Sequence, residues 1–407
     1  MKFDLPLYKN TIISLHALDP FGSKVGGIET HVRQVLRYQP EGTRIILIGV
    51  DDSGKLPLGE LVEITENECS YWFMPVMHCN QKIANSVAKK LTQSLTLNFF
   101  KSVIKFLRKI RAISSEMPTS IDIQRYEYAW LCQLIGCPYV LTTHGDMKPD
   151  QPMDSLLAKY PYIHHFNERH AVKYAAHVYS VNKEQTERIK TQIAGAAEKT
   201  EFMTVSVDDR IFKPTEYLNL NGPVQLAFVG RLDHFKRPGM MFNVIKRVNE
   251  LSPTGAHFHY VGAADPAVFP EFNAIKEIST LHGFKNATQI SKLWPQWHLG
   301  LVTSTFEGMP VYVLEALCAG RPVCSLHLPQ MHLVLKAKSS GTVLSENDDS
   351  KARVEELANT LLLYWLDMKS GKLLAEEVSK EVTPFKASIQ MSVLYNRHNK
   401  IQYASAL

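Results

Sequence analysis

The sequence lacks the features of a membrane-spanning or secreted chain. No run of about 18 consecutive apolar residues occurs, which argues against a spanning helix. Residues 1–20 contain charges and a proline where a secretion signal needs an unbroken apolar stretch. The six cysteines form no CxxC pair, so we expect reduced core residues rather than a disulfide framework or a zinc ribbon. These absences predict a cytoplasmic globular protein.

Acidic residues are missing from one long segment. Between Glu68 and Glu116 the chain has no Asp or Glu but has eight basic residues. Since the net charge of all 407 residues is only +5, this segment holds the whole positive excess. A charge this small for the length, without an accompanying readout motif, does not indicate a nucleic-acid partner.

The basic segment has a helical pattern. Its apolar residues recur every three or four positions, and the cations Lys101, Lys105, Arg108 and Lys109 accompany this stripe. Two interpretations stay open. The segment is either a basic amphipathic helix that lies on an anionic membrane and meets the acceptor there, or a helix that buries its stripe against a sheet and leaves the cations in solvent.

Short β-branched runs alternate with helical segments along the chain, which predicts an α/β fold with parallel sheets. The expected strands fall at 11–17, 43–50, 138–143 and 177–181, and then at 224–230, 257–262, 299–304 and 322–326. The turn-rich stretch 209–223 lies between the two series. We predict two Rossmann-like domains, 1–215 and 216–384, that face each other across a cleft, with a C-terminal helix at 385–407 that completes the first. Ligands bind such sheets beyond the carboxyl ends of the strands.

The most specific motif follows the strand that ends near residue 304. Glu307, Gly308 and Met309 lie at the start of an expected helix, and Pro310 suits its first turn. The start of this helix is a suitable position for a phosphate or a sugar oxygen. Glu315 lies eight positions after Glu307, too far along a helix for both carboxylates to act on one bond. They are either ordinary exposed glutamates or groups that hold two parts of one long ligand.

A second motif, FVGRLDHFKRP, covers residues 228–238. Gly230 ends a strand, and Arg231 and Lys236 follow it in the loop. Two cations at this position suit a diphosphate, and each charge-assisted hydrogen bond contributes about 1.5–3 kcal/mol. A solvated basic loop is the alternative. No Asp-x-Asp occurs in the chain, so the usual carboxylate clamp for a divalent metal has no candidate.

These motifs resemble family 4 glycosyltransferases of the GT-B fold. The spacing from Glu307 to Glu315 and the segment GRLDHFK resemble the family's donor signatures. GGIETHV, which begins at Gly26 and Gly27, resembles its first glycine loop, and VSVDDRIFKP at 205–214 resembles its interdomain segment. The resemblance spans residues 26–323. It implies retaining transfer from a nucleotide-diphosphate sugar, with no metal cofactor.

The resemblance also implies roles for single residues. Arg231 and Lys236 would neutralise the leaving diphosphate, Glu307 would hold hydroxyls of the donor sugar, and Glu315 would hold the ribose. His144, at the end of a strand, would lie near the sugar and the acceptor.

Further residues would contact the donor. The loop 308–310 would contribute its backbone, and Gly26 and Gly27 would let the first domain approach the phosphates. Phe284 would lie beside the nucleobase. The family's glycine-rich loop and Pro-Glu pair after residue 323 are absent, since the chain reads CSLHLPQMHLVL there.

The resemblance implies a glycosyltransferase that is peripheral on the inner face of the cell membrane and extends a cell-surface polysaccharide or a glycolipid. Its partners would be the nucleotide sugar and a glycan or lipid-linked acceptor. Two alternatives from other classes stay open: a nucleotide-sugar epimerase or phosphorylase on the same fold, and a non-catalytic donor-binding partner of another transferase.

Overall fold

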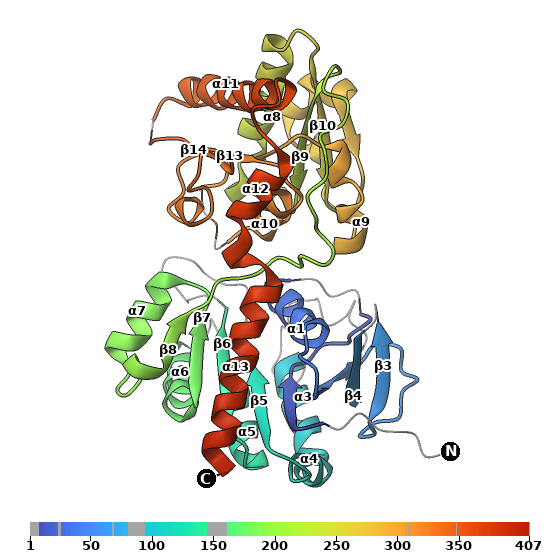
Figure 1. The fold of residues 1–407 in the computed structure, drawn as a ribbon, viewed down its shortest axis with the longest axis vertical. Coiled ribbons are helices and arrows are strands. Elements are labelled where there is room, and N and C mark those ends of the chain that lie inside the picture. Colours follow the sequence, from blue (N-terminus) through green and yellow to red (C-terminus); the bar gives the residue numbers. More distant parts are fainter. Residues whose placement is uncertain are drawn as a thin grey trace. The chain divides into compact units, whose positions relative to one another are not determined.

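The computed structural model describes residues 8–22, 26–66, 69–79, 94–144, 161–305, 307, 309–346 and 348–406 (Figure 1). The chain forms two compact units, Met1–Val205 with Gln390–Leu407, and Ser206–Ile389. Each unit is built on its own sheet, as the alternating sequence pattern predicts.

The sheet of the first unit has eight strands in the order β3-β4-β2-β1-β5-β6-β7-β8. Every neighbouring pair is parallel except β3 with β4. The strands are β1 (Asn10–Leu15), β2 (Thr43–Asp51), β3 (Val62–Glu66), β4 (Cys69–His78), β5 (Thr119–Ile123), β6 (Tyr139–Thr143), β7 (His177–Ser180) and β8 (Thr200–Phe202). Five of the six residues of β1 are fully buried, which is typical of a central parallel strand with both faces covered.

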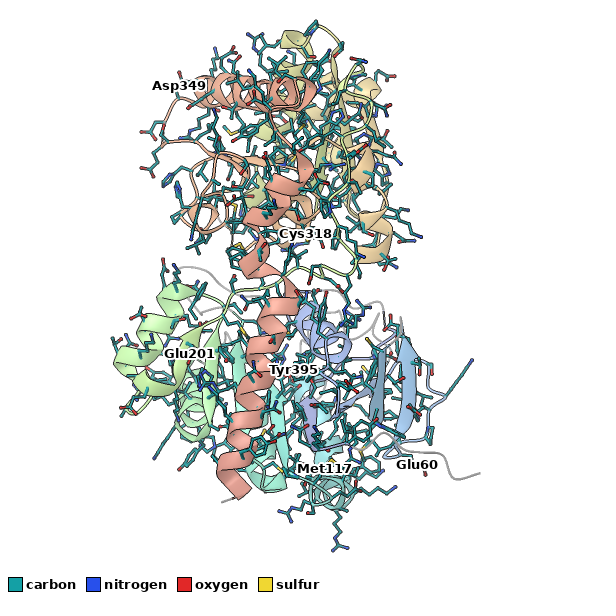
Figure 2. All side chains as sticks on the ribbon, in the orientation of Figure 1. Glu60, Met117, Glu201, Cys318, Asp349 and Tyr395 are labelled. Carbon is teal, nitrogen blue, oxygen red and sulfur yellow. The ribbon has the colours of Figure 1, made fainter. Side chains whose placement is uncertain are left out.

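Helices surround this sheet. They are α1 (Gly27–Arg37), α3 (Leu95–Lys105), α4 (Leu107–Ser114), α5 (Ala129–Ile135), α6 (Pro161–Tyr174) and α7 (Lys183–Gln192), and α13 (Ala387–Ala406) joins them from the C-terminal end of the chain. Residues 390–407 of α13 belong to the first unit, and Tyr395 of α13, labelled in Figure 2, donates a hydrogen bond to the carbonyl of Val35. The side chains of Leu394 and His398 are fully buried there.

The second unit has six parallel strands in the order β11-β10-β9-β12-β13-β14. They are β9 (Val224–Val229), β10 (Ala256–Val261), β11 (Ser279–Leu281), β12 (Leu299–Val302), β13 (Val323–Ser325) and β14 (Gly341–Val343). Its helices are α8 (Pro238–Leu251), α9 (Ala287–Ser291), α10 (Val311–Cys318), α11 (Ser350–Lys369) and α12 (Ala375–Glu381). The eight strands expected from sequence all appear, with ends that differ by a few residues, whereas β3, β4, β5, β8, β11 and β14 were not expected.

The boundary between the units differs from the predicted one. The sequence placed it after residue 215, but the segment from Ser206 belongs to the second unit. The reason is packing: Phe212 is buried, and Cys318 donates to its carbonyl. The guanidinium of Arg321, itself fully buried, donates to the carbonyl and the hydroxyl of Thr215 at 2.6 and 2.9 Å.

Two smaller expectations also need correction. All six cysteines are free, but only Cys132, Cys318 and Cys324 are buried, and the other three are half-buried at the margins of strands and turns. Of the described parts of the basic segment, residues 69–78 form β4, and residues 95–114 form two helices, α3 and α4, rather than one, because the chain departs from helical geometry at Phe106 (φ −101°, ψ 11°).

Candidate functional site

Lys236 and Glu307 meet in the structure although 71 positions separate them in sequence. The ammonium of Lys236 forms an ion pair with Glu307 Oε1, and the Ser304 hydroxyl donates to the same oxygen at 2.7 Å. Both charged side chains are largely buried, with 18% of Lys236 and 8% of Glu307 exposed. The two sequence motifs therefore form one charged cluster at the carboxyl ends of β9 and β12.

The backbone around this cluster is held in place by Thr303. Its hydroxyl donates to the carbonyl of Lys236 at 2.7 Å and is fully buried. Arg237, which follows, has a left-handed conformation (φ 52°) and caps α8 just before Pro238. A non-glycine residue in this region stores strain, so the loop is held by its contacts rather than by local preference. Sequence reasoning missed Thr303 and Ser304, although their place between a strand and Glu307 was a usable signal.

Arg231 and Gly230 form the start of the same loop. Gly230 has φ 150°, in the region that favours glycine, and its carbonyl accepts a hydrogen bond from the Tyr260 hydroxyl at 3.1 Å. The Arg231 side chain is 89% exposed and lies 3.3 Å from Asp233 Oδ2. Arg231 is thus a solvent-facing cation beside the Lys236 loop and is not packed into the cluster.

Glu315 lies in α10 and is buried. Burial raises the pKa of its carboxyl to about 7. No hydrogen bond to its side-chain oxygens is found among the described residues. Its carboxyl is therefore a group that a hydrogen-bond donor from a ligand would stabilise in the charged form.

The other predicted donor residues have mixed surroundings. Gly308 lies outside the described residues, Met309 is half-buried, and Pro310 is buried and caps α10 rather than lying in its first turn. Phe284 is 58% exposed, as a side chain available for stacking would be. In the first unit Gly26 caps α1 and Gly27 begins it. An added Cβ at Gly26 would crowd the Glu29 carboxylate, whereas one at Gly27 would meet open space.

His144 follows β6 in the first unit and has polar partners. Its Nε2 lies 2.7 Å from Gln124 Oε1, and its ring meets that of His31 edge-on, with centroids 5.3 Å apart. Burial lowers the pKa of His144 well below its usual value, and the nearby rings of His31 and His16 lower it further. His144 thus lies at the carboxyl edge of the first sheet, in surroundings that favour its neutral form.

The basic residues of α3 and α4 are exposed while their apolar stripe is not. Lys101, Lys105, Arg108 and Lys109 face solvent, although the Lys109 ammonium donates to the carbonyl of Gly59 at 3.2 Å. The stripe residues Phe99, Val103 and Ile110 are fully buried in the core of the first unit. Of the two interpretations, the described residues show the packed helix with solvated cations.

Comparisons with known proteins fit this geometry. The family model described as glycosyl transferases group 1 matches residues 223–362, the stretch that holds Lys236, Glu307 and Glu315. The second unit therefore contains a group 1 glycosyltransferase domain. A search of curated proteins finds no match.

Solved structures show that the whole chain has the GT-B fold. It is similar to sucrose-phosphate synthase from Thermosynechococcus elongatus, with a TM-score of 0.67 at 16% identity over 95% of this chain and 98% of the other. It is also similar to a UDP-forming trehalose-phosphate synthase from Burkholderia vietnamiensis, with a TM-score of 0.64 at 12% identity over 98% and 99%. A third is HepE from Anabaena in complex with UDP and glucose, with a TM-score of 0.58 at 14% identity over 95% and 98%. Identities this low establish the fold and not the substrate.

Proposed function

We propose that this glycosyltransferase moves a sugar from a nucleotide-diphosphate sugar to a glycan or lipid-linked acceptor with retention of configuration. The observation that carries the proposal is the buried ion pair of Lys236 with Glu307, beside the exposed Arg231. Two similar structures support a nucleotide-sugar donor, since HepE was solved with UDP and glucose and the pneumococcal O-GlcNAc transferase with UDP and GlcNAc.

The paired charges suit the two ends of such a donor. Lys236 and Arg231 would neutralise the diphosphate as negative charge develops on it, which is electrostatic stabilisation of the transition state. These cations would supply the positive charge for which other transferases use a metal. Glu307 would accept hydrogen bonds from hydroxyls of the sugar, and Glu315 would do the same for the ribose.

The transfer itself needs no general base from the protein. The bond between the sugar C1 and the leaving phosphate oxygen breaks, and the acceptor oxygen forms its bond to C1 on the same face. The acceptor proton passes to the leaving phosphate oxygen. Because the acceptor oxygen bonds to C1 directly, we do not assign Glu307 as a nucleophile. His144 would contact the sugar near the acceptor.

The proposal places the enzyme in the cytoplasm, peripheral on the inner face of the cell membrane, in cell-surface polysaccharide or glycolipid synthesis. Within the described part of the chain, none of the helices has the length and apolarity needed to cross a bilayer. The exposed cations of α3 and α4 support an acceptor carried on an anionic surface, which charge would hold while Phe99, Val103 and Ile110 of the apolar stripe stay packed in the core.

The test begins with a thermal-shift screen of nucleotide sugars and continues with donor turnover. With the donor found, Lys236→Ala and Glu307→Ala should each lower kcat/KM by about 10²-fold, the scale measured for electrostatic groups of this kind. Lys246→Ala is the matched control, because Lys246 forms an exposed pair with Glu250 on α8. Full turnover in both site variants would show that the assigned site is wrong. Product formed without acceptor would favour the epimerase, and no turnover with any donor would favour the non-catalytic partner.

A further inference from the structure

A chain of polar side chains lies behind His144 in the first unit. β5 and β6 are parallel neighbours, so Gln124 and His144, which follow their last residues, lie at the same edge of the sheet. Asp122 is in β5 and its side chain is fully buried. Neither Asp122 nor Gln124 belongs to the motifs that indicate donor binding.

The hydrogen bonds of this chain fix the orientation of the Gln124 amide. Gln124 Nε2 donates to Asp122 Oδ2 at 2.8 Å, because a carboxylate can only accept. The amide oxygen must then face His144 Nε2, 2.7 Å away. Since an amide oxygen is an acceptor, His144 Nε2 carries the hydrogen, and in the neutral ring Nδ1 keeps the lone pair.

The surroundings of His144 keep its ring neutral. Desolvation is the largest cause of its lowered pKa, followed by His31 on α1 and by His16 after β1. Glu29 on α1 acts in the opposite direction, and Arg125 after β5 lowers the pKa as well. His31 is itself a buried imidazole with a pKa lowered by burial. No partner of His144 Nδ1 is found among the described residues.

We infer that Asp122 and Gln124 are positioning residues that hold His144 with its Nδ1 lone pair as a hydrogen-bond acceptor for a hydroxyl of the sugar substrate. The inference rests on the proposed function for its substrate. It has a consequence for specificity, because an accepting nitrogen binds an O–H group and has no hydrogen to donate to a phosphate or carboxylate oxygen. At this position the site selects a sugar hydroxyl and disfavours a carboxylate.

Nitrogen-15 NMR of the histidine rings tests the positioning directly. In the full-length protein at pH 7.5, His144 should show a protonated Nε2 and an unprotonated Nδ1, with signals assigned by their loss in His144→Asn. Gln124→Leu removes the acceptor, so both tautomers should appear. Gln133→Leu is the matched control, because Gln133 Oε1 faces His170 Nε2 at 3.2 Å in an exposed pair of the same kind. It should leave the His144 signals unchanged.

Kinetics with the donor test the substrate contact. Gln124→Leu should lower kcat/KM about tenfold, with Gln133→Leu at the wild-type value. Gln124→Glu places a carboxylate at Nε2 and stabilises the imidazolium, so its loss of activity should be largest at acidic pH and recover as pH rises through the raised His144 pKa. A purely structural role would give no such pH profile.

The outcomes separate this inference from the proposed function. A His144 ring with a protonated Nδ1 in the wild type, or a tautomer unchanged in Gln124→Leu, overturns the inference whatever the activity. A changed tautomer with unchanged kcat/KM overturns the substrate contact. Absence of donor turnover in the wild-type protein counts against the proposed function alone, and the NMR result still decides the positioning.

Discussion

At the residue scale, the pairing of Lys236 with Glu307 changes how each side chain is understood. The sequence motifs assign them to separate ligands, Lys236 to a diphosphate and Glu307 to a sugar. In the structure the two side chains form an ion pair with each other. Two largely buried charges are stable when they are paired and hydrogen-bonded, and Ser304 supplies the additional hydrogen bond. Binding of a donor at this site would therefore replace one ion pair by two sets of ligand contacts.

Glu315 gives a prediction of pH-dependent stability. Its carboxyl has a pKa raised from 4.5 to about 7, so the folded protein binds a proton that the unfolded chain releases. The contribution of this group to the free energy of unfolding is fully present below pH 4.5. It is lost as the pH rises from 4.5 to about 7, at up to about 1.4 kcal/mol per pH unit. The side chain in Glu315→Gln stays neutral at every pH. The free energy of unfolding of this variant, relative to that of the wild type, should therefore increase between pH 5 and pH 8.

Denaturant unfolding of both proteins across this range checks the effect. Glu356→Gln is the control, since Glu356 is an exposed residue of α11. A pH-independent difference for Glu315→Gln would mean that the Glu315 carboxylate is solvated in the folded protein.

The sequence predicted only those residues of the candidate site that belong to recognisable motifs. Lys236, Glu307 and Glu315 were predicted because charged residues at a strand end and a helix start have a recognisable spacing. Gln124 was not, because an amide that orients a histidine has no spacing of its own and is identified only when β5 and β6 pair. Its contact with His144 depends on tertiary structure.

At the element scale, α3 and α4 show what amphipathic periodicity does and does not determine. The repeat of apolar residues correctly indicated a buried face, and Phe99, Val103 and Ile110 are in the core. Periodicity could not tell whether that face meets a sheet or a membrane, because both are apolar. In the tertiary structure the stripe packs into the core of the first unit, so the exposed surface of these helices carries the cations together with the exposed Leu97 and Ile104.

The exposed cations give a prediction for vesicle binding. Replacing Lys101, Lys105 and Arg108 together by Gln should weaken binding to phosphatidylserine-containing vesicles by about 100-fold, because each cation near an anionic surface contributes about 1 kcal/mol. Binding of the wild type should also fall steeply with added salt. Vesicle sedimentation at two salt concentrations measures both effects.

A charge-matched control separates this face from net charge. Lys351, Lys372 and Lys380 are exposed residues of the second unit, and their replacement by Gln removes the same total charge. Vesicle binding of this variant should stay near the wild-type value. Equal loss in both triple variants would reject the α3–α4 face as the membrane contact.

At the scale of the whole molecule, sequence predicted two parallel-sheet domains but not their strand counts. The strands it found are buried on both faces and rich in β-branched residues, as in β1 and β2. It missed β3, an edge strand with only one buried residue, and the three-residue β11 and β14, which have little pattern to detect. It also missed β5, a fully buried strand whose TSIDI sequence contains an aspartate.

The packing of α13 in the first unit leads to the prediction that a change in this helix destabilises the first unit and not the second. Leu394 of α13 is fully buried within the first unit, while its neighbour Val393 is 46% exposed. Leu394→Ala should therefore cost about 2–5 kcal/mol through lost burial and a cavity, and Val393→Ala within about 0.5 kcal/mol. Each unit has its own sheet and core, so the cost should fall on the first unit alone. Hydrogen exchange should show faster exchange in β1 and β5 of Leu394→Ala, with β9 and β12 unchanged. Equal acceleration in both sheets would instead show that the two units unfold as one cooperative structure.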